Sequence, residues 1–182
     1  MYDGKEYLIE KYAIAIIPGL KLINLKPFKR YSIKPLLLGA SFGKEFPLIG
    51  TEQELHEILQ VLGGADILQN KNFTFSKIRK LLEKNDYSII HFSTHGFFSH
   101  NLNESFLVTY DKKLMMNDLD ALINISNKGR KQPLELVVFS ASETAQGNKR
   151  TAPLGLAGIV VKAGARSALG TLWNVNENQL CD

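Results

Sequence analysis

The sequence predicts an α/β fold with a mostly parallel sheet and helices on both faces. Three runs, at residues 36–40, 87–92 and 134–139, are short and largely apolar, β-branched or aromatic, which is the pattern of strands covered on both sides. Segments with helical apolar spacing alternate with these runs, as in a parallel sheet. Of the 182 residues, 45% are hydrophobic and 22% are charged, so the composition suits one compact domain.

A helix is predicted over residues 51–62, after the first strand. Thr51 and Glu54 have the spacing of a capping box, in which each side chain accepts a hydrogen bond from the other residue's backbone N–H. Gly63 and Gly64 then match the usual end of a helix. The apolar residues of this segment lie on one stripe: Leu55, Ile58, Leu59 and Leu62.

The later elements follow from similar local signals. Thr74 is expected to cap a helix over residues 75–84, because Ile78, Leu81 and Leu82 form an apolar stripe there. The other expected elements are a short strand at residues 67–68, a hairpin formed by residues 106–110 and 113–115, and a helical turn that starts at Asn117.

Small polar residues follow two of the buried runs. Residues 91–96 read His-Phe-Ser-Thr-His-Gly, and residues 137–145 read Val-Val-Phe-Ser-Ala-Ser-Glu-Thr-Ala. Because ligands of open parallel sheets bind beyond the carboxyl ends of the strands, His95 and Ser142 are expected to converge there. Gly96 would let a substrate approach the backbone, and its N–H would face a developing oxyanion.

Each of these residues also has an ordinary explanation. His95 alone would fit a strand-end histidine bonded to a backbone carbonyl, and Ser142 alone would fit a helix cap. The two motifs in this order favour an active site instead. The other histidines carry less weight, because His91 is expected to be buried in its strand, His56 lies within a helix and His100 lies in a polar loop.

These motifs carry a family resemblance. The segment around His95 resembles the histidine motif, and the segment around Ser142 the nucleophile motif, of the caspase-like, separase-related CHAT peptidases. Residues 153–175 resemble the family's helix, Ala-Gly-Ala turn and Trp-containing strand, and residues 7–17 resemble its extended opening segment. The resemblance implies a caspase-like three-layer sandwich, formed by a single CHAT domain over residues 1–182 that lacks its final C-terminal elements.

The resemblance also implies roles for the site residues. The family has a cysteine where Ser142 stands, His95 would pair with that nucleophile, and the N–H groups of Gly96 and residue 142 would hold the oxyanion. Because an alcohol ionises much less readily than a thiol, the domain is expected to be inactive or substrate-trapping. The pocket for the substrate side chain would be lined by Ser41, Phe42 and Ser140. Three carboxylates are candidates for selecting a basic substrate side chain: Asp111, Asp118 and Asp120.

Three functions remain open at this point. The first is a cysteine endopeptidase domain with a disabled nucleophile, and the second is a non-catalytic caspase-like module that binds a peptide or regulates a partner. The third, a serine hydrolase that uses Ser142 and His95, is weakest because no Gly-x-Ser-x-Gly elbow surrounds the serine. Whether Ser142 is natural or engineered is also open.

Partners and location complete these expectations. We expect a protein or peptide substrate and a regulatory or second chain that completes the fold, in the cytoplasm. No metal or cofactor is expected, and the one cysteine, Cys181, excludes an internal disulfide and a cysteine-based zinc site. No nucleic acid is expected despite the net charge of +4, because the basic clusters at residues 26–30 and 128–131 fit solvated loops. No membrane is expected either, since the apolar stretch at residues 13–25 is interrupted by polar residues.

Overall fold

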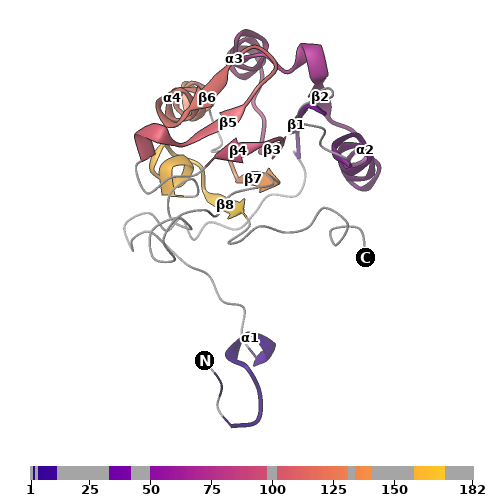
Figure 1. Cartoon of the computed structure of the whole chain (residues 1–182), viewed down its shortest axis with the longest axis vertical. Helices are drawn as coiled ribbons and strands as arrows, with labels where there is room; N and C mark the ends of the chain where they lie inside the picture. Colours follow the sequence, from indigo (N-terminus) through magenta and orange to yellow (C-terminus); the bar gives the residue numbers. More distant parts are fainter. Residues whose placement is uncertain are drawn as a thin grey trace.

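The structure is a computed structural model of the chain (Figure 1). It describes residues 2, 4–11, 33–41, 50–97, 102–130, 134–140 and 158–170. Its main sheet has the strand order β2-β1-β3-β7-β8, and every neighbouring pair is parallel. The bounds of these strands are Pro35–Gly39 for β1, Asp66–Gln69 for β2, Ile89–Ser93 for β3, Leu136–Ser140 for β7 and Ser167–Gly170 for β8.

Helices cover both faces of this sheet. Helix α2 (Thr51–Leu62) lies on one face, and α3 (Phe75–Lys84), α4 (Met116–Asn127) and the helical residues 158–162 lie on the other (Figure 1). Strand β1 is buried on both sides, because Leu36 and Leu38 belong to the core under α3 and α4, whereas Gly39 faces α2. The expected three-layer α/β sandwich with a mostly parallel sheet is therefore confirmed.

The larger core layer lies between the sheet and helices α3 and α4. Its centre is formed by Phe92 of β3 and Phe139 of β7, whose rings stack with centroids 5.5 Å apart. The helices contribute buried aliphatic side chains to this layer: Ile78, Leu82, Leu119, Leu122 and Ile123. Each fully buried side chain of this size contributes about 1.5–3 kcal/mol to folding, so this layer holds the two motif-bearing strands side by side.

A small antiparallel sheet follows β3. It has the order β4-β5-β6, with β4 at Gly96–Phe97, β5 at Phe106–Val108 and β6 at Lys113–Met115. The central side chains of β5 and β6, Leu107 and Leu114, are fully buried in the main core. The short 3-10 turns η3 and η4 lie at Asn70–Asn72 and Leu102–Glu104.

Most of the predicted elements are confirmed. The helices at residues 51–62 and 75–84 have the expected bounds, and Thr74 caps the second one by accepting a hydrogen bond from the Lys77 N–H. Gly63 ends the first helix in the left-handed conformation, with φ at 70°. Residues 106–108 and 113–115 pair as the expected hairpin. The strands expected at residues 87–92 and 134–139 begin two residues later, because the Ser88 carbonyl instead accepts hydrogen bonds from the N–H groups of Glu135 and Leu136.

The expectations for the opening segment and for the basic cluster at residues 128–131 are wrong. The opening segment is not extended throughout, since α1 (Leu8–Lys11) forms one helical turn, with the Glu10 carboxylate accepting a hydrogen bond from the Tyr7 N–H at 2.5 Å. Arg130, from the basic cluster at residues 128–131, does not lie in a solvated loop. Its side chain is 4% exposed and donates hydrogen bonds to Ser126 Oγ at 3.0 Å, to Asp86 Oδ1 at 3.2 Å and to the Tyr87 carbonyl.

Candidate active site

The two motif segments leave the sheet at the same edge. Strands β3 and β7 are parallel neighbours, and their last residues, Ser93 and Ser140, face each other in the register. The Thr94 N–H then donates a hydrogen bond to the Ser140 carbonyl at 3.1 Å, which continues the pairing one step beyond the strands. The chain therefore leaves β3 toward His95, and β7 toward position 142, from neighbouring points of the sheet. Ser142 and Phe42 themselves lie outside the described residues.

His95 is held between two anchored neighbours. Thr94 is fully buried, and its Oγ1 donates a hydrogen bond to the Val108 carbonyl at 2.6 Å. The His95 carbonyl accepts a hydrogen bond from the Val108 N–H at 2.8 Å. These bonds fix the backbone at the histidine, while its side chain is only partly buried and can meet a ligand.

The N–H of Gly96 is directed away from β5. Gly96 pairs with Leu107, and the flanking bond runs from the Val108 N–H to the His95 carbonyl. That pattern identifies Gly96 and Leu107 as a non-hydrogen-bonded antiparallel pair, in which neither N–H is used by the partner strand. The amide of Gly96 is thus kept out of the β4–β5 ladder, which suits the oxyanion role that the resemblance implied.

Glu54 is the site residue that sequence reasoning missed. The expected capping box is wrong, because Gly50 is the N-cap of α2 and Thr51 is buried one residue inside the helix. The Glu54 carboxylate instead turns toward the sheet, where it accepts hydrogen bonds from Ser93 Oγ at 2.6 Å and from His91 Nε2 at 2.9 Å. His91 is buried as expected, yet it is bonded to a carboxylate rather than being a purely apolar core residue.

The electrostatics of Glu54 favour its ionised form. Burial raises the pKa of this carboxyl, but the hydrogen bonds from His91 and Ser93, the charge of His91 and the nearby Ser140 hydroxyl outweigh burial and lower the pKa below the usual 4.5. An ionised carboxylate only accepts hydrogen bonds, so His91 carries its proton on Nε2. One acceptor group thus binds two side chains of β3, the strand that leads to His95.

A glycine allows α2 to approach the sheet this closely. A Cβ on Gly39 would lie 2.9 Å from both Leu55 Cδ1 and Thr51 Cγ2, and 2.8 Å from the Ser93 carbonyl oxygen. Any larger residue at the end of β1 would push the first turn of α2 outward. The sequence signal for this contact was a glycine within an otherwise buried strand, which often marks a close approach of another element.

Two of the predicted substrate-binding residues, Ser41 and Ser140, lie near the carboxyl ends of β1 and β7. The Ser41 N–H donates a hydrogen bond to Asn70 Oδ1 at 3.1 Å, which ties the end of β1 to η3. Ser140 lies at the carboxyl end of β7, opposite Ser93, and helps to lower the pKa of the Glu54 carboxyl. Each of the three aspartates accepts a hydrogen bond: Asp111 from the Phe75 N–H at 3.1 Å, Asp118 from the Met115 N–H at 3.2 Å, and Asp120 from Asn124 Nδ2 at 3.0 Å.

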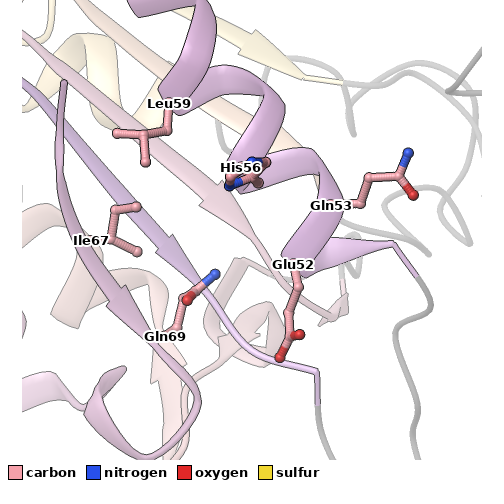
Figure 2. Close-up of a pocket in the computed structure, with 6 residues that line it drawn as sticks. All are labelled: Glu52, Gln53, His56, Leu59, Ile67 and Gln69. Atoms are coloured by element: carbon pink, nitrogen blue, oxygen red, sulfur yellow. The ribbon is translucent and has the colours of Figure 1, made fainter. Parts of the chain in front are cut away.

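A shallow groove of about 460 Å³ lies between α2 and β2 (Figure 2). It involves none of the residues predicted for the site. It is lined by residues of helix α2 and of the edge strand β2: Glu52, Gln53, His56, Leu59, Ile67 and Gln69. Because β2 is separated from β3 by β1, this groove belongs to a different part of the sheet from the segment that carries His95.

Two further properties concern the described part of the chain. Within it, no three histidine, cysteine or carboxylate side chains are arranged to hold a metal ion. None of the helices placed by the structure has the length and apolar character that a bilayer crossing requires.

The chain matches a protein-family model over almost all of its length. The model described as CHAT domain matches residues 1–180, which is nearly the entire chain. No curated protein matches the sequence.

Proposed function

Because the chain belongs to the CHAT domain family, which is caspase-like and related to peptidases, we propose that it is a cysteine-type endopeptidase domain with a substituted nucleophile. His95 and residue 142 are the dyad, and the whole chain acts as one domain. The observation that carries this proposal is the parallel pairing of β3 with β7, because the two motif segments leave the sheet together at the edge where such folds bind ligands.

The chemistry assigns a separate task to each residue. With a cysteine at position 142, its thiolate would attack the scissile carbonyl, and His95 would pair with the thiolate and then protonate the leaving amine. The amide of Gly96 would donate to the oxyanion, for which its place outside the β4–β5 ladder is suitable. Ser41, Phe42 and Ser140 would contact the side chain of a protein or peptide substrate.

Serine at position 142 changes the outcome. A thiol ionises at a pKa of about 8.5, which a neighbouring imidazolium lowers readily, whereas an alcohol needs a well-oriented base during the attack itself. The chain as it stands would therefore bind a substrate and release little product, which is substrate trapping.

Ser142 also supports a second candidate function. A caspase-like module that binds a peptide or regulates a partner without cleaving it would need no thiol at this position. A second chain that completes the fold would fit either function.

The test is to restore the thiol. Ser142→Cys should create peptide cleavage that iodoacetamide blocks, and His95→Ala added to it should abolish cleavage. Ser142→Ala is the matched control and should remain as inactive as the unchanged chain. The assay uses a peptide library. If the cysteine variant neither cleaves a peptide nor reacts with a peptidyl electrophile, the binding module replaces the peptidase.

A further inference from the structure

We propose that Glu54 is a positioning residue for the active site, because its carboxylate holds the end of β3, which is bonded to the end of β7, and thereby sets the spacing of the two segments that carry His95 and position 142. The identity of the positioned residues rests on the proposed function. The clamp itself, defined as Glu54 with His91 and Ser93, is a feature of the structure.

The clamp is built from two donors on β3 and one acceptor on α2. Ser93 and His91 are 3% and 6% exposed, and both donate to the Glu54 carboxylate. Charge-assisted hydrogen bonds of this kind are about twice as strong as neutral ones. The helix α2 is therefore connected through a single side chain to the end of β3, where Ser93 pairs with Ser140 of β7.

The clamp lies close to the residues it would position. Ser93 precedes His95 by two residues, and Ser140 precedes position 142 by two residues. Two extended residues span about 7 Å, so a small rotation at either serine is carried almost directly to the reacting group. A misplacement of about 1 Å at a reacting group can reduce a rate about a hundredfold.

Backbone bonds extend the clamp across three strands. The Ser93 carbonyl accepts a hydrogen bond from the Ala40 N–H at 3.3 Å, and the Ser140 carbonyl accepts one from the Thr94 N–H at 3.1 Å. Both bonds lie just past the regular strands. Their protection from exchange consequently reports on whether Glu54 holds the strand ends together.

Stability alone does not account for this arrangement. Apolar side chains also hold α2 on the sheet, with Leu37 and Leu55 fully buried. Buried ionic groups contribute little net stability, and replacing such a group together with its partners by apolar side chains is often neutral or stabilising. The polar cluster is found at the end of β3, directly before His95 and beside the end of β7, which is where precise geometry matters for catalysis.

The first experiment uses the chain with Ser142 unchanged and needs no cleavage. Amide hydrogen exchange is compared in wild type, Glu54→Gln and Glu54→Ala, with Glu52→Gln and Glu52→Ala as matched controls from the same helix turn. Glu52 accepts one hydrogen bond, from Asn70 Nδ2 at 3.0 Å. We expect Glu54→Ala to accelerate exchange at Ala40 and Thr94 at least tenfold more than at Ile90 and Val137, with Glu54→Gln intermediate and the controls unchanged.

Uniform acceleration at all four amides, or no acceleration at Ala40 and Thr94, would overturn the proposal. If Glu54→Ala does not fold, Glu54→Gln decides the question by the same comparison, because its amide retains the shape and one acceptor oxygen. The NMR chemical shift of the His95 backbone amide in the same variants adds a second readout, which we expect to change for the Glu54 variants and to stay constant for the Glu52 variants.

The second experiment adds the Glu54 variants to Ser142→Cys. We expect kcat to fall at least tenfold with KM changed less than twofold, and the Glu52 controls to retain both values. An active cysteine variant whose kcat is insensitive to Glu54 overturns this inference alone. An inactive cysteine variant, together with selective loosening of Ala40 and Thr94, overturns the proposed function and leaves the clamp supported.

Discussion

Replacing Gly39 with alanine should destabilise the fold through the contact between β1 and α2. The added Cβ would lie 2.8 Å from the Ser93 carbonyl oxygen and 2.9 Å from carbons of Thr51 and Leu55. Carbon atoms prefer separations of about 3.5–4.0 Å, so the helix or the end of β3 must move by about half an ångström or more. The oxygen belongs to the backbone and Leu55 is fully buried, so neither neighbour can simply rotate away.

The magnitude follows from two opposing effects. Overpacking of a tight contact costs about 1–3 kcal/mol. Alanine also restricts the unfolded chain, which stabilises by about 0.4–1 kcal/mol where the backbone conformation is compatible. We therefore expect a net loss of about 1–2 kcal/mol, which corresponds to a decrease in Tm of about 2–8 °C for a domain of this size.

Thermal and urea unfolding followed by circular dichroism measure this loss. Gly170→Ala is the matched control, because Gly170 also ends a strand of the same sheet, and its added Cβ would meet Phe139 Cβ at an ordinary 3.9 Å. We expect the control to stay within about 0.5 kcal/mol of wild type. A Gly39→Ala protein as stable as wild type, or an equal loss in the control, would refute the close approach of α2.

Two further predictions concern charged residues. The folded-state pKa of Glu54 is lowered, so its stabilising contribution is present above the usual value of 4.5 and is lost as pH falls through the folded pKa. The urea midpoint should therefore fall more for wild type than for Glu54→Gln between about pH 6 and about pH 3. Parallel curves of midpoint against pH would contradict this. Arg130→Met should lose about 2–4 kcal/mol, because it leaves Ser126 and the Tyr87 carbonyl without their donor. Lys128→Met, at an exposed position, should stay within about 0.5 kcal/mol in the same urea titration, and similar losses in both variants would count against the buried role of Arg130.

Local signals in the sequence were sufficient for most of the fold. Helix bounds at residues 75–84 follow from a cap at Thr74 and an apolar stripe, both of which act within a few residues. The buried runs at β3 and β7 predicted central strands, and the alternation with helices predicted that these strands are parallel. The two motif segments were therefore correctly expected at one edge of the sheet.

The role of Glu54 was decided only by the tertiary structure. Thr51 and Glu54 have capping-box spacing, and a local hydrogen bond and a long-range one compete for the same carboxylate. The long-range partners prevail because Ser93, which lies 39 positions away, and His91 meet this carboxylate once β1 pairs with β3 and Gly39 lets α2 approach. The spacing of Thr51 and Glu54 in the sequence indicates only the local hydrogen bond. The strand order and the approach of α2 determine which donors are buried beside the carboxylate and must be satisfied.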